Sequence, residues 1–233
     1  MVKLVYLINR FEFMGKTAIL LGATGLTGNL LLKRLLDDDR YDKVKLFSRS
    51  AASIAHSKIE EHLIDLFELE KYQSLFTGDE VFCCVGTTTA KTPDKAFYKK
   101  IDYDIPLNAA KLCKVNQIPM FIVISALGAN PDSRIFYNRL KGEMEAAVLA
   151  VGISQTYILQ PSLISGYRKE RRMGEWIAKQ LMKLFNIIMI GPMRKYRSIH
   201  PDIIAKAMIS LANNPMDKKR IESEEIKKIA KQG

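Results

Sequence analysis

Short apolar segments alternate with amphipathic ones along most of the chain. Ranges 27–36, 68–76, 103–114 and 138–150 repeat apolar residues at the spacing of a helix. The apolar runs between and around them, which predict strands, are 17–21, 43–49, 61–66, 80–86, 120–125 and 155–160. This alternation is typical of a parallel sheet with helices on both faces. It predicts an α/β fold built on a doubly wound parallel sheet.

The pattern loosens after Pro161. We expect residues 162–200 to form a small C-terminal cap over the carboxyl ends of the strands, with a helix over 176–185 and a basic cluster, "YRKERR", at 167–172. A packed closing helix is predicted over 200–212. The predicted organisation is one domain over 14–215, preceded by an N-terminal extension, 1–13, and followed by a charged C-terminal tail, 216–233, expected to be a solvated helix.

Composition limits the class of protein. The chain has 233 residues, of which 48% are hydrophobic and 26% charged, enough for one ordinary core and unlike a disordered chain. A net charge of +11 favours anionic partners without choosing among nucleic acid, a membrane surface and a phosphorylated small molecule. With no apolar run of about 18 residues and only scattered histidines, we expect a cytoplasmic protein without membrane insertion or a metal site.

Three glycines stand between the first predicted strand and its helix. Gly22, Gly25 and Gly28 form a turn in which backbone amides can approach a diphosphate at the positive end of the helix, as in Rossmann-type folds. An arginine, Arg49, ends the second strand about 20 residues later, where NAD sites place an acid. Guanidinium suits a phosphate, and Ser48 offers a hydroxyl donor, so the sequence predicts NADP(H) as the cofactor.

A second group of polar residues follows the fifth predicted strand. Ser125 ends that strand, and Tyr137 and Lys141 stand four positions apart near the start of the next helix, hence on one face. A neighbouring ammonium stabilises a tyrosine phenolate, which suits the tyrosine to proton transfer, while the serine would hold the substrate oxygen. We interpret Ser125, Tyr137 and Lys141 as catalytic residues.

The glycine turn, the serine and the Tyr-x-x-x-Lys pair together resemble the short-chain dehydrogenase/reductase superfamily. The chain is similar to its atypical NAD(P)-binding branch, and most of all to the Tat-interacting-protein-like oxidoreductases, through "FCCVGTT", "KGEMEAAV" and "RRMGEW". Met173 departs from that pattern, in which a proline usually precedes Gly-Glu-Trp. Together with the glycine turn and the end of the second strand, the resemblance implies a set of cofactor-binding residues, namely Gly22, Thr24, Gly25, Leu26, Thr27, Gly28, Ser48, Arg49, Asp65, Leu66, Val85, Gly86, Thr87, Lys141, Pro161 and Leu163.

These observations favour an NADPH-dependent reductase of a small carbonyl substrate, whose oxygen Ser125 would polarise. An alternative is a regulator that binds NADPH and a protein partner without turnover, and a third is a nucleic-acid binder, although no specific nucleic acid is expected. The sequence leaves monomer and homodimer equally open. Asn108 is the nearest candidate for the superfamily's proton-relay asparagine.

Overall fold

A seven-stranded parallel sheet forms the centre of the protein. The computed structural model describes residues 15–165 and 196–232. The strands are β1 (Lys16–Leu21), β2 (Tyr41–Ser48), β3 (Ile59–Leu63), β4 (Glu80–Cys83), β5 (Met120–Ile124), β6 (Gln155–Gln160) and β7 (Arg220–Glu222). Their order is β3-β2-β1-β4-β5-β6-β7 and every neighbouring pair is parallel. The predicted doubly wound sheet is confirmed, and the order reverses direction between β1 and β4, which is where such sheets bind ligands.

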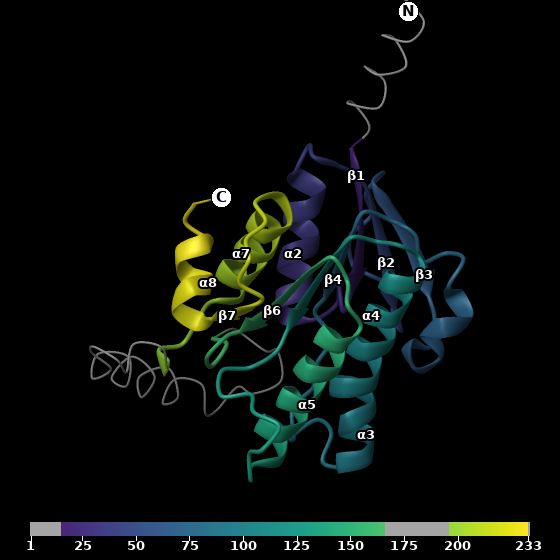
Figure 1. Ribbon diagram of the computed structural model, residues 1–233. Coiled ribbons are helices and arrows are strands. Elements are labelled where there is room, and N and C mark those ends of the chain that lie inside the picture. The colour runs from purple at the N-terminus through teal and green to yellow at the C-terminus, as the bar shows by residue number, and fades with distance from the viewer. Residues whose placement is uncertain (1–14, 166–195, 233) are drawn as a thin grey trace, which may run out of the picture.

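Helices cover both faces of this sheet (Figure 1). One face carries α2 (Leu26–Asp37), α7 (Pro201–Asn213) and α8 (Ser223–Ile229), and the other carries α3 (Lys95–Lys99), α4 (Ile105–Val115) and α5 (Phe136–Ala150). The described residues also form two short irregular helices, η1 (Leu66–Tyr72) of the 3-10 type and η2 (Lys100–Asp104) of the π type.

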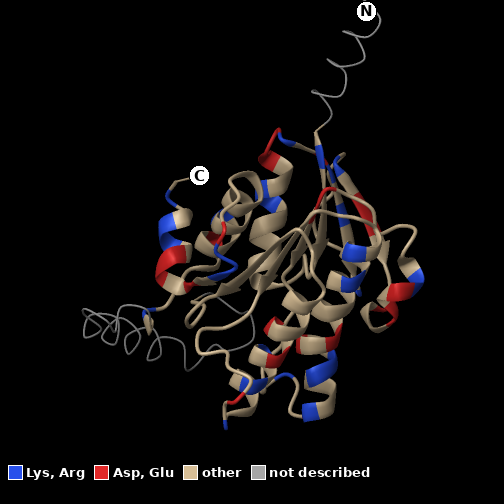
Figure 2. Cartoon of the chain, in the orientation of Figure 1, with Lys and Arg blue, Asp and Glu red and all other residues tan. Residues whose placement is uncertain are grey.

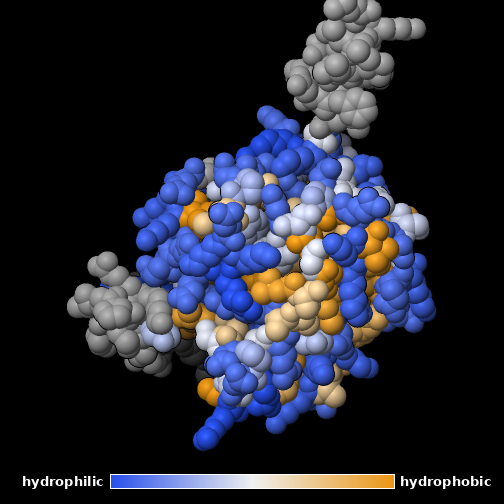
Figure 3. All heavy atoms as spheres, in the orientation of Figure 1, coloured by the Kyte–Doolittle hydropathy of each residue, from blue (hydrophilic) through white to orange (hydrophobic). Residues whose placement is uncertain are grey.

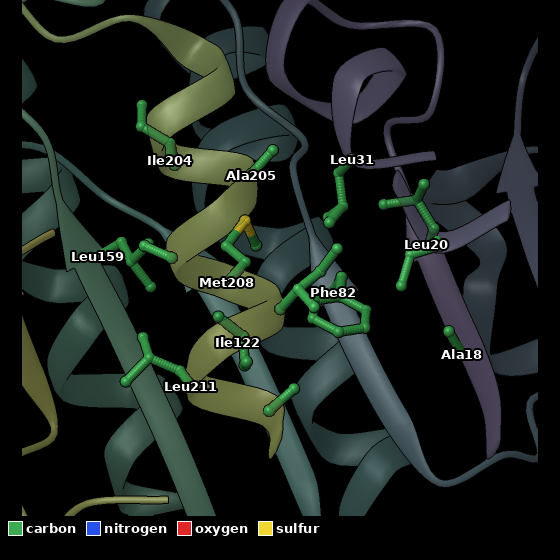
Figure 4. Packing of buried hydrophobic residues seen from close by; sticks show 14 of the residues in the cluster. Ala18, Leu20, Leu31, Phe82, Ile122, Leu159, Ile204, Ala205, Met208 and Leu211 are labelled. Carbon is green, nitrogen blue, oxygen red and sulfur yellow. The ribbon is translucent and has the colours of Figure 1, made fainter. Parts of the chain in front are cut away.

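The central strands are buried on both faces because their side chains alternate between two cores. On β1, Ala18 and Leu20 join the core beneath α2 and α7, whereas Ile19 and Leu21 join the one beneath α4 and α5. Figure 4 shows the first core, with Met208 of α7 among side chains of the sheet. A continuous apolar run such as that of β1 is what a strand covered on both faces requires.

The C-terminal tail differs from its prediction. The sequence predicts a solvated helix over 216–233, yet Arg220–Glu222 adds the seventh strand beside β6 and α8 packs on α7. Ile221 and Ile226 are 0% exposed and Ile229 is 8% exposed. Acidic and basic residues occupy many of the other positions of this segment (Figure 2). The three buried isoleucines are spaced among these charged residues, so the sequence pattern of the segment is that of a solvated helix.

The second strand–helix unit also differs in detail. The sequence predicts a strand over 61–66, but β3 ends at Leu63, and Asp65 instead caps η1 by accepting a hydrogen bond from the Phe67 amide at 2.9 Å. A carboxylate followed by an amide two residues on competes with strand pairing, which explains the early end.

Several predictions fall outside the described residues: the extension 1–13, the helix over 176–185, the basic cluster 167–172 and most of the cap. In the described part of the chain, no helix has the length and apolar character to cross a membrane. The same residues contain no group of three or more acidic, histidine or cysteine side chains arranged to hold a metal.

Candidate active site

The glycine turn brings β1, the start of α2 and the end of β4 into close contact. Gly22 has φ +83°, and a Cβ there would lie 2.8 Å from the Cys84 carbonyl carbon. A Cβ on Gly28 would lie only 2.0 Å from the Gly22 carbonyl oxygen. The Gly25 amide donates to that same oxygen at 3.0 Å. Only glycine fits at Gly22 and Gly28, so the turn is a compact backbone surface.

The start of α2 is suited to an anion. Gly25 is the N-cap, so no side chain of the cap residue satisfies the first amides of the helix, and its first turn carries no acidic residue. Such amides and the positive helix end together favour a phosphate group. Because Gly22 and Gly28 carry no Cβ, the turn stays compact, and the first amides of α2 border it. This arrangement fits the diphosphate of a nicotinamide dinucleotide.

The end of β2 bears out the position of Arg49 and changes the role expected of Ser48. Arg49 is exposed, immediately after the strand. Ser48 is 4% exposed and its hydroxyl donates to the Ser50 carbonyl at 2.8 Å. Because a hydroxyl has one hydrogen, Ser48 shapes the turn that carries Arg49 and, in this arrangement, is not a donor to a phosphate.

The loop after β4 is held by a buried carboxylate that the sequence analysis missed. Asp102 is 1% exposed and accepts a hydrogen bond from the Thr87 amide at 2.8 Å. Its other oxygen lies 2.7 Å from the Lys141 ammonium. Asp102 therefore fixes the predicted ribose-binding loop and the predicted catalytic lysine at once.

Asp102 sits in the π turn η2, directly before α4. Its residue number is three before Ile105 and seven before Ala109, which are both buried on the apolar face of that helix. The position of Asp102 in line with these apolar residues was the sequence signal that this acid is buried, since a charged side chain on an apolar face needs a partner. Asn108, the nearest candidate for a proton-relay asparagine, lies on α4, and that role stays a prediction. The carboxylate that contacts Lys141 is Asp102.

Tyr137 and Lys141 both lie on α5, close to its N-terminus. Gly142 brings this helix against the preceding loop, since a Cβ there would be 2.3 Å from the Asn130 carbonyl carbon. Tyr137 is 37% exposed, and its ring lies 6.4 Å from that of Tyr98. Burial raises the pKa of Tyr137, the Lys141 charge lowers it and Asp102 raises it, with a net rise. The tyrosine is thus a neutral phenol at neutral pH, and the Lys141 charge, expected to bring its pKa toward the working range, does not offset the effect of burial in this structure.

Lys141 is 3% exposed. Burial lowers the pKa of its ammonium, but the Asp102 carboxylate and its hydrogen bond raise it, and the net effect is a rise. Lys141 is therefore a charged partner for Tyr137 rather than a proton donor.

Ser125 lies one residue past β5 and is 4% exposed. Its hydroxyl donates to Glu145 at 2.5 Å, a second buried carboxylate that the sequence analysis did not name. Tyr137, Lys141 and Glu145 recur every four residues along α5, so this spacing was the available signal.

The end of β6 borders the same edge of the sheet. The Pro161 carbonyl accepts from the Leu127 amide at 2.9 Å, and Leu163 is 64% exposed. The ends of β1, β4, β5 and β6, which are adjacent in the sheet, thus carry the glycine turn, the Thr87 loop, Ser125 and Pro161. Asp65 and Leu66 follow β3, farther along the same edge.

Comparisons with known proteins agree with this geometry. Residues 22–162 match the model of a family described as NAD(P)H-binding. Protein HTATIP2 of Rattus norvegicus is 33% identical over 174 residues, which cover 73% of this chain and 72% of that protein. The mitochondrial protein FMP52-1 of Scheffersomyces stipitis is 33% identical over 158 residues, covering 66% of this chain and 69% of that protein. The crystal structure of the Bordetella bronchiseptica enzyme WbmH in complex with NAD+ superimposes with a TM-score of 0.67 at 14% identity, over 94% of this chain and 80% of that one.

Proposed function

The chain belongs to the NAD(P)H-binding family of atypical short-chain dehydrogenases/reductases, and from this we propose that it is an NADPH-dependent oxidoreductase that reduces a small carbonyl compound. The observation that carries the proposal is the position of Tyr137 and Lys141. Both lie on α5 next to the Thr87 loop, at the edge of the sheet that holds the glycine turn. A fold alone does not imply a reaction, whereas a site of this kind supports one.

The bound cofactor would supply a hydride to the carbonyl carbon. The glycine turn and the start of α2 would hold its diphosphate, and the loop from Val85 to Thr87 would border the nicotinamide ribose. Tyr137 would donate its phenolic proton to the substrate oxygen, and its position on α5 one turn from Lys141 supports that role. Lys141, held by Asp102, would stabilise the phenolate that remains.

Preference for NADPH rests on Arg49. The residue is exposed at the end of β2, where an acid would instead hold the ribose hydroxyl of NAD. Thermal-shift titrations with NADPH and NADH test this, since a ligand at 100 times its Kd adds about 2.7 kcal/mol to stability. We expect NADPH to stabilise the wild type more than NADH, and Arg49→Ala to remove the difference. Lys111→Ala, which removes an exposed cation from α4, is the matched control.

Turnover is tested separately by Tyr137→Phe. We expect the variant to keep its affinity for NADPH and to lose carbonyl reduction across a panel of small ketones and aldehydes. NADPH binding without turnover by the wild type would refute the enzyme and favour the regulatory alternative with a protein partner. Scattered exposed hydrophobic residues (Figure 3) are ordinary for a protein surface and favour neither. The cytoplasmic location and the choice between monomer and homodimer stay predictions.

A further inference from the structure

A buried polar cluster lies behind Ser125, built by α5, β6 and β7. Its centre is the carboxylate of Glu145, which is 1% exposed. Ser125 Oγ donates to Glu145 Oε1 at 2.5 Å, and Gln160 Nε2 donates to the two carboxylate oxygens at 2.8 and 3.0 Å. Arg220 Nε donates to Oε2 at 2.8 Å. The hydroxyl of Ser125, which is predicted to contact the substrate, therefore already donates its hydrogen to a protein side chain.

The hydrogen in this contact belongs to the serine. A carboxylate has only acceptor sites, and the Arg220 guanidinium supplies the opposite charge that a buried carboxylate needs. A hydroxyl has one hydrogen, so once it is donated to Glu145 the oxygen of Ser125 has only lone pairs to offer elsewhere. Such an oxygen can accept a hydrogen bond from a ligand but cannot donate one to a carbonyl.

We propose that Glu145 is a positioning residue that makes Ser125 a hydrogen-bond acceptor, so that Ser125 binds a hydroxyl group of the ligand rather than a bare carbonyl oxygen. The proposal rests on the proposed function for the location of the site, and refines its substrate class to hydroxyl-bearing compounds. Tyr137 keeps the role of proton donor to the reacting oxygen. This assignment is an alternative to the expectation that Ser125 polarises the carbonyl, and the experiments below separate the two.

Arg220 extends the arrangement to the end of the chain. Its side chain is 49% exposed, whereas that of its partner Glu145 is 2% exposed. The arginine reaches the cluster because β7 pairs with β6, where Gln160 is opposite Glu222. The C-terminal strand therefore helps to hold the carboxylate behind Ser125.

The hydrogen bond between Ser125 and Glu145 is tested without any substrate. We would compare the melting temperatures of Ser125→Ala, Glu145→Leu and the double variant, because leucine can neither donate nor accept a hydrogen bond. If the two groups share one hydrogen bond, the double variant melts no lower than Glu145→Leu alone, whereas additive losses overturn the proposal. Glu143→Leu, at a more exposed acid on the same helix, is the control and should be additive with Ser125→Ala. Neutron diffraction of the deuterated wild type places the hydrogen itself: a deuterium on Ser125 pointing away from Glu145 overturns the assignment.

Ligand preference is tested with NADPH and two ketones: 2-hydroxyacetophenone, which carries a hydroxyl beside its carbonyl, and acetophenone, which does not. The side-chain amide that Glu145→Gln introduces can donate to Ser125, which then no longer offers the same free lone pairs to a ligand hydroxyl. Glu145→Gln should therefore raise the ratio of the KM for the hydroxyketone to the KM for the ketone about tenfold, the effect of one hydrogen bond. The ratio should not respond to this change in the Ser125→Ala background. An unchanged ratio in the single variant overturns the proposal. A wild type that converts neither compound counts against the proposed function, and the melting cycle then decides the role of Glu145 by itself.

Discussion

Gly28→Ala should disrupt the dinucleotide turn by steric contact alone. The added Cβ would lie 2.0 Å from the Gly22 carbonyl oxygen, 2.8 Å from its carbonyl carbon and 3.2 Å from the Ala23 Cα. These are backbone atoms, so no side chain can rotate out of the way. To restore even a 3.0 Å contact, the start of α2 must move about 1 Å away from β1.

The cost of this displacement follows from the packing around it. Leu31, Leu32 and Leu35 of α2 are all 0% exposed, so the helix cannot shift without disturbing the core. Overpacking of a close-packed site costs about 1–3 kcal/mol. For a domain of this size, each kcal/mol lowers Tm by about 2–4 °C, so we expect a Tm about 2–12 °C lower. NADPH affinity should also fall, because the amides that face the diphosphate move with the helix.

Differential scanning calorimetry with and without NADPH measures both effects. Gly25→Ala is the matched comparison, because its Cβ would meet the same oxygen at 3.2 Å and the required movement is a few tenths of an ångström. We expect Gly25→Ala to lose less stability than Gly28→Ala. If Gly28→Ala melts with the wild type and binds NADPH equally well, the backbone contact described for this turn is wrong.

Three further predictions concern the buried charges and the C-terminal strand. Asp102→Asn removes the negative charge that lies 2.7 Å from the Lys141 ammonium, and breaking a buried pair in this way should cost about 3–5 kcal/mol in urea denaturation. Lys71→Ala, which breaks an exposed pair, is the control and should leave the denaturation midpoint almost unchanged. Because the pKa of Lys141 is raised in the folded protein, the stabilisation from its charge is complete below the ordinary lysine pKa and is lost as pH rises through the folded pKa. The difference in stability between wild type and Lys141→Met should therefore stay flat from pH 7 to about 10 and shrink above it. A decline already at about pH 8 would contradict the raised pKa. Ile221→Ala removes a side chain that is 0% exposed and should cost about 2–5 kcal/mol, whereas Lys219→Ala beside it should change stability by less than about 0.5 kcal/mol; equal effects would mean that β7 is not part of the core.

Periodicity was sufficient for the central strands because each is buried on both faces. The run around Leu20 has one interpretation, a short strand under helices, and the structure agrees. Periodicity failed in the C-terminal segment, where Ile221 stands alone between Arg220 and Glu222. A three-residue edge strand shows too little of a repeat to be recognised, and its burial depends on β6, more than 50 residues away along the chain.

The candidate site divides in the same way. The glycines and the Tyr137–Lys141 pair could be predicted from the sequence because their function depends on the spacing of residues close together in the chain. Asp102 and Glu145 could not, because each matters through a contact with another element: Asp102 with α5 and Glu145 with the end of β5. A lone acid in a helical segment is usually solvated, and the sequence does not show which acids are buried.

These two acids also change how the net charge of +11 should be interpreted. Asp102 pairs with Lys141, and Glu145 pairs with the half-exposed Arg220, so each of the two buried carboxylates at the site has a cationic partner. The described surplus of positive charge lies on the surface, where salt screens it within about 10 Å. Net charge is thus no argument for an anionic substrate at Tyr137. In the proposed site, the donor is Tyr137, one turn from the Lys141–Asp102 pair, and the acceptor is Ser125, whose hydrogen is bonded to Glu145.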